Sequence, residues 1–236
     1  MPAVILAAGR GSRLGSLTAD RPKALLQVAG RTLVERQVSL LRRSGVGRIY
    51  IVTGFARELF RSMFDDAVQE IHNPDWMTTN NLVSLATAAG ALDGGFILFN
   101  SDVLLHPGIL DALLRAQHPC ALAVDDQRPL ADEEMKVVLD ANGRLTAIAK
   151  TLDPATACGE YIGLAKFDPA GADRLRSAMA GMIAAGRTNE WYEAAFQAIA
   201  PEVALQTCST AGLPWIEIDT PEDLAQAENL ALAHSL

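Results

Sequence analysis

Cysteine is rare in this chain, with three residues among 236. Cys120, Cys158 and Cys208 are far apart and form no CxxC pair or Cys/His spacing. The sequence therefore gives no support for a zinc site or a disulfide framework. This usage is typical of reduced thiols in the cytosol, so we expect a cytoplasmic protein.

Excess positive charge and long apolar runs are also missing. The formal net charge is −8 at pH 7, and no basic stripe of the kind that binds nucleic acid is visible. No apolar run reaches the roughly 20 residues of a membrane span, and residues 3–8 are too few for the apolar region of a signal peptide. We expect neither a nucleic-acid partner nor a membrane partner.

Half of the residues are hydrophobic, which suits one α/β domain at this length. Apolar runs that read as strands alternate with helix patterns along most of the chain, which predicts a mostly parallel sheet with helices on both faces. An Asn-Gly turn between two apolar runs predicts a hairpin. The expected strands are 3–8, 25–28, 48–53, 69–72, 95–100, 120–124, 135–139, 145–149, 161–167 and 214–218, and the expected helices are 32–44, 56–64, 80–92, 107–117, 170–185, 191–200 and 221–233.

The loop after the first expected strand combines small residues with positive charge. It reads LAAGRGSRL (Leu6 to Leu14) and continues to DRPK (Asp20 to Lys23). Glycine lets a backbone approach an anion closely, and the N–H groups of such a turn point at it. A dinucleotide fingerprint fails because Leu14 replaces its last glycine, and no Walker A lysine follows. The loop is thus expected to hold a polyphosphate through Arg10, Arg13 and Lys23, the alternative being an ordinary solvated loop.

Four segments together resemble the signature of nucleotidyltransferases with a Rossmann-like fold: LAAGRGSRL, RPKALLQVAGRTLVERQVSLL, FNSDV (Phe99 to Val103) and EIDTPEDL (Glu217 to Leu224). Such enzymes transfer a nucleoside monophosphate from an NTP to a phosphorylated acceptor and release pyrophosphate. The resemblance spans nearly the whole chain. It implies a single domain over residues 1–236, a Rossmann-like three-layer α/β/α sandwich with a mostly parallel central sheet. A small β-containing insertion, within about 125–165 and 186–213, would bind the acceptor.

The resemblance also implies a nucleotide site on the glycine loop. Triphosphate contacts carry over to Gly9, Arg10, Gly11, Arg13 and Lys23. The base and ribose would lie against the end of the first strand, at Leu6, Ala7 and Ala8.

Two aspartates follow expected strands at their carboxyl ends, where open α/β sheets bind ligands. Mg²⁺ binds carboxylates and phosphate oxygens, and the resemblance places Mg²⁺ on Asp102 and Asp219. Simpler roles are a turn residue for Asp102 and a helix cap for Asp219. Together with Arg13 and Lys23 they are the expected catalytic residues. The acceptor phosphate is already an anion, so positioning and charge neutralisation suffice for in-line attack.

Residues 73–84 are similar to the NP…NN…SL pattern of the choline-phosphate cytidylyltransferase branch, which also contains makers of CMP-phosphonates. Residues 133–150, 159–167 and 189–196 agree with this branch. The resemblance favours CTP, with Asn80, Asn81 and Ser84 at the nucleotide, although asparagine is also a preferred helix cap.

A cationic acceptor would need acids and aromatic rings, and aromatic residues make up only 6% of the chain. Neighbouring residues on a helix point in different directions, so at most two of residues 190–193 share a pocket, and either tryptophan could instead fill core. Phosphocholine and 2-aminoethylphosphonate both stay open. The expected acceptor-binding residues are Lys150, Glu160, Tyr161, Glu190, Trp191, Tyr192 and Trp215.

Two other functions are kept as alternatives. One is a sugar-1-phosphate or polyol-phosphate nucleotidyltransferase. The other is a nucleotide-sensing regulatory subunit without activity, which the presence of Arg13, Lys23, Asp102 and Asp219 disfavours. A homodimer is left open.

Overall fold

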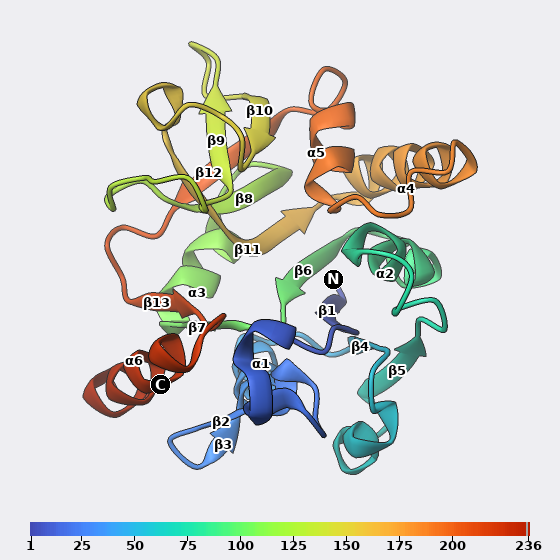
Figure 1. Cartoon of the computed structure of the whole chain (residues 1–236). Coiled ribbons are helices and arrows are strands. Elements are labelled where there is room, and N and C mark those ends of the chain that lie inside the picture. Colours follow the sequence, from blue (N-terminus) through green and yellow to red (C-terminus); the bar gives the residue numbers. More distant parts are fainter. Residues whose placement is uncertain (235) are drawn as a thin grey trace.

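The computed structural model describes residues 1–234 and residue 236, and a nine-stranded sheet forms the centre of this part of the chain (Figure 1). Four strands on one side are parallel, in the order β6 (Phe96–Asn100), β1 (Ala3–Ala7), β4 (Ile49–Thr53) and β5 (Val68–His72). Short apolar runs form them because parallel strands are covered on both faces. This half confirms the strand–helix alternation expected from the sequence.

The other side of the sheet contains two strands of opposite direction, one beside β6 and one in a hairpin. β11 (Gly159–Phe167) pairs antiparallel with β6 and with β8 (Cys120–Asp125), and β12 (Leu205–Ser209) is parallel to β8. The expected hairpin is present as β9 (Lys136–Leu139) and β10 (Leu145–Ala149), which joins the start of β11. The central sheet is thus mostly parallel, with the hairpin as its extension.

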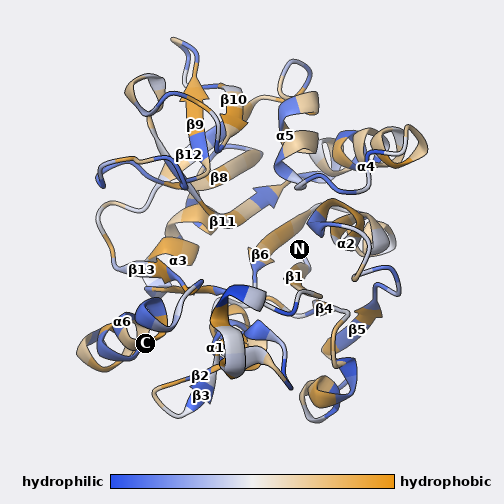
Figure 2. Cartoon of the chain, in the orientation of Figure 1, coloured by the Kyte–Doolittle hydropathy of each residue, from blue (hydrophilic) through white to orange (hydrophobic). Residues whose placement is uncertain are grey.

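Helices cover both faces of the sheet, which confirms the three-layer sandwich. Alternate residues of β1 enter two separate cores, since side chains alternate along a strand: Val4 and Leu6 face one, Ala3 and Ile5 the other. Figure 2 shows hydrophobic colour along β6, between these layers. The first core is closed by α2 (Asn81–Thr87), α4 (Pro169–Ala184) and α5 (Glu193–Ile199), and the second by α1 (Leu33–Arg43) and α3 (Pro107–Arg115).

A third, smaller core lies under α6 (Pro221–His234), where Ala227 and Ala231 pack with Val28 and Leu33. Two short ladders flank it: β2 (Gln27–Val28) with β3 (Arg31–Thr32), and β7 (Val103–Leu105) with β13 (Trp215–Glu217). The β7–β13 ladder joins segments more than 100 residues apart and brings the two expected aspartates to one place.

The structure corrects several expected elements. Residues 56–64 form a 3₁₀ helix, Arg57–Met63, instead of an α-helix. The helix expected over 80–92 ends at Thr87, before a separate 3₁₀ turn, Ala89–Ala91, and the one expected over 191–200 begins at Glu193. Strands β3, β7 and β12 were not expected, because strands of two or three residues and the polar run of β12 leave little periodic signal.

Within the described residues, no helix combines the length and the apolar character that are needed to cross a membrane.

Candidate active site

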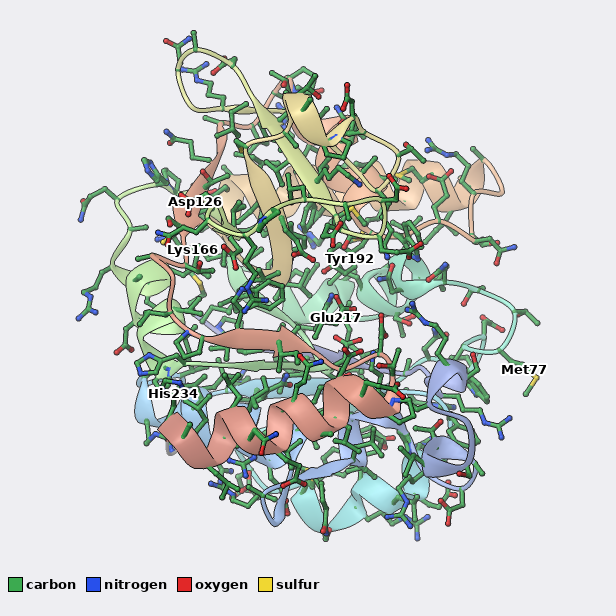
Figure 3. The ribbon with its side chains drawn as sticks, turned by 60° about the vertical axis from the view of Figure 1, so that its left-hand side comes forward. Met77, Asp126, Lys166, Tyr192, Glu217 and His234 are labelled. Atoms are coloured by element: carbon green, nitrogen blue, oxygen red, sulfur yellow. The ribbon has the colours of Figure 1, made fainter. Side chains whose placement is uncertain are left out.

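A cleft of about 390 Å³ opens where β1 and β6 end. Figure 1 shows the two halves of the chain that meet there, one with α1 and α6 and one with the β9–β10 hairpin. Glu217 and Tyr192 lie between these two halves in the view of Figure 3. Residues from both halves line the cleft: Leu6, Gly9, Gly11, Ser12, Arg13, Lys23, Asn80, Asn81, Asn100, Ser101, Asp102, Glu133, Met135, Lys150, Tyr161, Gly163, Trp191, Glu193, Glu217 and Asp219.

Three carboxylates meet at the floor of the cleft. One oxygen each from Asp102, Glu217 and Asp219 lies within 4.8 Å of the others. The β7–β13 ladder causes this approach, since Glu217 pairs with Val103 and the Ile218 N–H donates to the Asp102 carbonyl at 3.0 Å. Asp102 Oδ1 is buried and has no hydrogen-bond partner among the described residues. An unpartnered carboxylate oxygen beside two further carboxylates fits a hard divalent cation such as Mg²⁺.

Two cations hold this carboxylate group in place. Lys23 Nζ lies 2.9 Å from Asp102 Oδ2 and 2.5 Å from Asp219 Oδ1, and Arg13 Nη2 lies 2.7 Å from Asp219 Oδ2. Lys23 is 8% exposed. Burial lowers the pKa of Lys23, but the two carboxylates outweigh burial and raise it above its usual value, which keeps the lysine charged.

The glycine loop is shaped around Lys23. Gly11 has φ +78°, and a Cβ placed there would lie 2.8 Å from Lys23 Cβ. Only glycine therefore fits, both for its backbone conformation and for the close approach. Pro22 is extended and precedes the 3₁₀ turn Lys23–Leu25, which turns the lysine toward the cleft.

Arg10 does not line the cleft. Its guanidinium donates to the carbonyls of Thr18 and Ala19 at 3.3 Å and lies 5.3 Å from the Phe55 ring centroid. In this position the side chain fastens the loop, and its expected contact with a triphosphate stays a prediction.

Some of the other expected nucleotide contacts line the cleft and others do not. Leu6, Gly9, Asn80 and Asn81 line the cleft. The asparagines also cap: Asn80 Oδ1 accepts from the Asn81 N–H, and Asn81 Oδ1 accepts from the Tyr192 N–H, each at 2.8 Å.

Three expected nucleotide residues lie outside the cleft lining. Ala7 and Ala8 are buried in the two cores. Ser84 is buried one helical turn into α2, where its hydroxyl accepts from Asn73 Nδ2 at 3.1 Å. Its side chain is therefore used to join α2 to the segment before it rather than to meet a ligand.

The opposite wall of the cleft contains Glu193, which the sequence did not single out as a binding residue. It is the first residue of α5, it is 6% exposed, and its Oε2 has no hydrogen-bond partner among the described residues. Burial raises the pKa of Glu193 to about 7. Lys150 Nζ lies beside it on this wall, 5.4 Å from the Trp191 ring centroid and 3.7 Å from Glu133 Oε2.

Four expected acceptor residues do not line the cleft. Glu190 forms an exposed pair with Arg187, and Glu160 lies on β11 beside Asp125 and Lys136. Trp215 is buried, and its Nε1 donates to Asp125 Oδ2 at 2.6 Å. Tyr192 is buried beneath the cleft, where its hydroxyl contacts Asn100 Oδ1 at 2.8 Å. Lys150, Tyr161 and Trp191 do line it.

The sequence carried a signal for one missed residue. Glu217 and Asp219 are two apart at the end of a strand, so they share a face. Glu193 was within the stretch 190–193 expected to contain an acceptor pocket, but residue type and spacing did not select it over Glu190, Trp191 and Tyr192.

Comparisons with known proteins identify the family of the chain. The family model of the MobA-like NTP transferase domain matches residues 3–157. A CMP-5'-(3-aminopropyl)phosphonate synthase from Streptomyces rubellomurinus is 40% identical over 150 residues, which are 61% of this chain and 24% of that protein. A bifunctional IPC transferase and DIPP synthase from Rubrobacter xylanophilus is 32% identical over 98% of this chain and 52% of its own. The chain thus spans about a quarter and about half of these relatives.

The fold also matches a solved structure. The CTP:phosphocholine cytidylyltransferase from Streptococcus pneumoniae superposes with a TM-score of 0.81 over 97% of this chain and 98% of its own, at 22% identity. The resemblance to the Rossmann-like nucleotidyltransferases and to their choline-phosphate and aminophosphonate branch is confirmed.

Proposed function

The chain belongs to the MobA-like NTP transferase domain family, and we propose that it transfers CMP from CTP to a small phosphate or phosphonate whose other end is a primary ammonium, with release of pyrophosphate. The observation that carries the proposal is the buried carboxylate of Glu193, whose Oε2 has no hydrogen-bond partner among the described residues, in the same cleft as Lys23, Asp102 and Asp219.

The floor of the cleft supports nucleotidyl transfer. Asp102 and Asp219, with Glu217 beside them, would hold Mg²⁺, which when bound would neutralise phosphate charge. Lys23 and Arg13 lie against these carboxylates and would bind the β- and γ-phosphates of the leaving pyrophosphate. An acceptor phosphate needs no general base, because its oxygen already carries the charge with which it attacks the α-phosphorus.

The nucleotide would enter beside the glycine loop. The backbone of Gly9 and Gly11 leaves room for the phosphates. Asn80 and Asn81 line the cleft at the start of α2 and could offer amide groups to the base or ribose. The preference for CTP rests on the relatives rather than on any one of these contacts.

The acceptor wall supports a cation. A buried carboxylate without a partner is costly, and a bound ammonium would supply the missing hydrogen bond at Glu193 Oε2. Trimethylammonium cannot donate one and instead requires several ring faces, whereas Trp191 is the one exposed ring among the residues lining the cleft of the described chain. We therefore rank aminoalkylphosphonates and phosphoethanolamine above phosphocholine. Lys150 could meet the acceptor phosphate.

The runner-up is a polyol-phosphate or sugar-1-phosphate acceptor. The similarity to the Rubrobacter protein over 98% of this chain favours it, but such an acceptor would not bring an ammonium to Glu193 Oε2. A regulatory subunit without activity is disfavoured because Arg13, Lys23, Asp102 and Asp219 all lie in the cleft.

The test is pyrophosphate release with Mg²⁺, each of four NTPs, and a panel of acceptors. The panel contains 2-aminoethylphosphonate, 3-aminopropylphosphonate, phosphoethanolamine, phosphocholine, inositol 1-phosphate and glucose 1-phosphate. We expect turnover with CTP and the primary amines. Turnover confined to inositol or glucose phosphate would overturn the acceptor assignment, and release without Mg²⁺ would overturn the metal dependence.

A further inference from the structure

A buried glutamine lies behind the turn that carries Asp102. Gln37 is 3% exposed and shares the apolar face of α1 with Leu33, Val34, Leu40 and Leu41. A polar amide on such a face is costly unless its hydrogen bonds are made. Packing alone therefore does not explain why a glutamine occupies this position.

The amide of Gln37 holds both ends of one turn. Its Nε2 donates to the carbonyls of Asn100 and Val103, at 2.9 Å each. Asn100 ends β6 and Val103 begins β7, so the two acceptors flank Ser101 and Asp102. One NH₂ group therefore fixes the separation of the strands from which the Asp102 side chain projects.

Only the donor side of this amide is used. Gln37 Oε1 is buried and has no hydrogen-bond partner among the described residues. The two carbonyl acceptors fix the orientation of the amide, because an oxygen facing them would be repelled. A side chain that leaves one polar atom unsatisfied in the core breaks a packing rule, and such breaks concentrate near functional sites.

Packing alone does not hold the turn on this side. A cavity of about 270 Å³ borders Gln37, with Phe99, Val103 and Leu104 among its other walls. When the two hydrogen bonds are lost, the β7 backbone is held by its ladder with β13 and by the Ile218 N–H, and it has open space on the side of α1.

We propose that Gln37 is a positioning residue for Asp102, setting its distance from Asp219 and Glu217 without touching substrate. This inference rests on the proposed Mg²⁺-dependent transfer, in which these carboxylates hold the metal. Gln37 acts on the backbone that carries Asp102 and not on its carboxylate; loss of a hydrogen bond in the outer shell of a metal site typically changes metal affinity or activity by about 10–100-fold.

The test compares Gln37→Met with wild type. The substitution keeps side-chain length and removes both donors. We expect backbone amides of residues 101–104 to exchange hydrogen about tenfold faster or more, and half-saturating Mg²⁺ in pyrophosphate release to rise about tenfold, while KM for CTP changes less than threefold. Binding of Mn²⁺ with α,β-methylene-CTP, which needs no turnover, should weaken in parallel. Gln37→Glu keeps the shape but replaces the donor by an oxygen, and it should behave like Gln37→Met.

Lys166→Met is the matched control. Lys166 is also buried, and its Nζ donates to the Ala116 carbonyl at 2.5 Å, away from the cleft. We expect it to lower thermal stability without changing exchange at 101–104 or the Mg²⁺ requirement. Unchanged exchange and metal binding in both Gln37 variants would overturn the proposal. Hydrogen exchange needs no substrate, so a failure of the proposed reaction with every acceptor would still leave the effect of Gln37 on the turn measurable.

Discussion

The charged groups on the two walls of the cleft differ in whether they are paired. We call the wall at the glycine loop the nucleotide wall and the wall that contains Glu193 the acceptor wall. On the nucleotide wall, Lys23 and Arg13 are paired with Asp102 and Asp219. On the acceptor wall, Glu193 is buried, and one of its oxygens has no hydrogen-bond partner within the described part of the chain. In the proposed reaction, the first wall must exchange partners when a triphosphate and a metal bind, so its affinity would depend on geometry held by the backbone. The second wall would gain a partner on binding, and it would therefore select an acceptor by charge.

The largest expected effect follows from removing the charge of Asp102 on the nucleotide wall. Asp102→Asn keeps the shape of the side chain but removes its charge. We expect pyrophosphate release to fall by roughly 10³-fold, because charge stabilisation of the transferring phosphoryl group is lost. Circular dichroism and thermal melting should show an intact fold. Activity within tenfold of wild type would contradict the metal assignment.

The second prediction concerns the backbone of the glycine loop, which positions Lys23. Gly11→Ala places a Cβ 2.8 Å from Lys23 Cβ at φ +78°, so the lysine must shift, and we expect kcat/KM for CTP to fall about 100-fold, as misplacement by about 1 Å can cost. Gly15→Ala is the control, because Gly15 also has positive φ, +57°, but a Cβ placed there would meet no atom within 4 Å. Equal losses in both variants would mean that backbone strain alone is responsible.

The nucleotide wall was also the wall that could be predicted from the sequence. Its residues lie in short motifs, and the carboxyl ends of parallel strands bring such motifs together. Arg10 is the exception, since the direction of its side chain depends on Phe55 and the Thr18 carbonyl. The alternation of strands and helices likewise fixed the layers, whereas the reversed direction of β11 and the β7–β13 ladder depend on distant pairing.

The acceptor wall was harder to predict because two of the aromatic residues expected there are buried in the core. Trp215 is held by a hydrogen bond to Asp125, 90 residues away in the chain, and Tyr192 by one to Asn100. Residue type alone made them resemble binding residues. Gln37 could not be recognised from the sequence as a residue near the site, because it occupies a position that helical spacing assigns to the core.

The third prediction compares Glu193 with Glu190, three residues earlier in the chain. Glu193→Gln should raise KM for 2-aminoethylphosphonate about tenfold or more, with KM for CTP unchanged, because a charge-assisted hydrogen bond to the ammonium is worth about 1.5–3 kcal/mol. Glu190→Gln is the control: Glu190 pairs with Arg187 at the surface, where such pairs contribute little. Steady-state kinetics that show equal effects of the two substitutions would remove Glu193 from the acceptor site.

The last expected effect is on stability rather than on catalysis, and it has a defined pH dependence. The folded protein holds the Glu193 proton with a pKa of about 7, against an ordinary value of 4.5, so ionising this carboxyl in the folded state costs free energy. The cost is absent below pH 4.5, grows as pH rises, and is complete above pH 7, where about 1.4 kcal/mol per pKa unit gives on the order of 3 kcal/mol.

Glu193→Gln removes this cost. The free energy of unfolding of the variant, relative to wild type, should therefore increase between pH 4.5 and pH 8 in urea denaturation. Adding 2-aminoethylphosphonate at pH 8 should narrow the difference, because the ammonium stabilises the ionised carboxylate of wild type only. A difference that stays constant with pH would mean that Glu193 is not desolvated, and the acceptor wall would then offer an ordinary solvated charge in place of the selective one proposed for it.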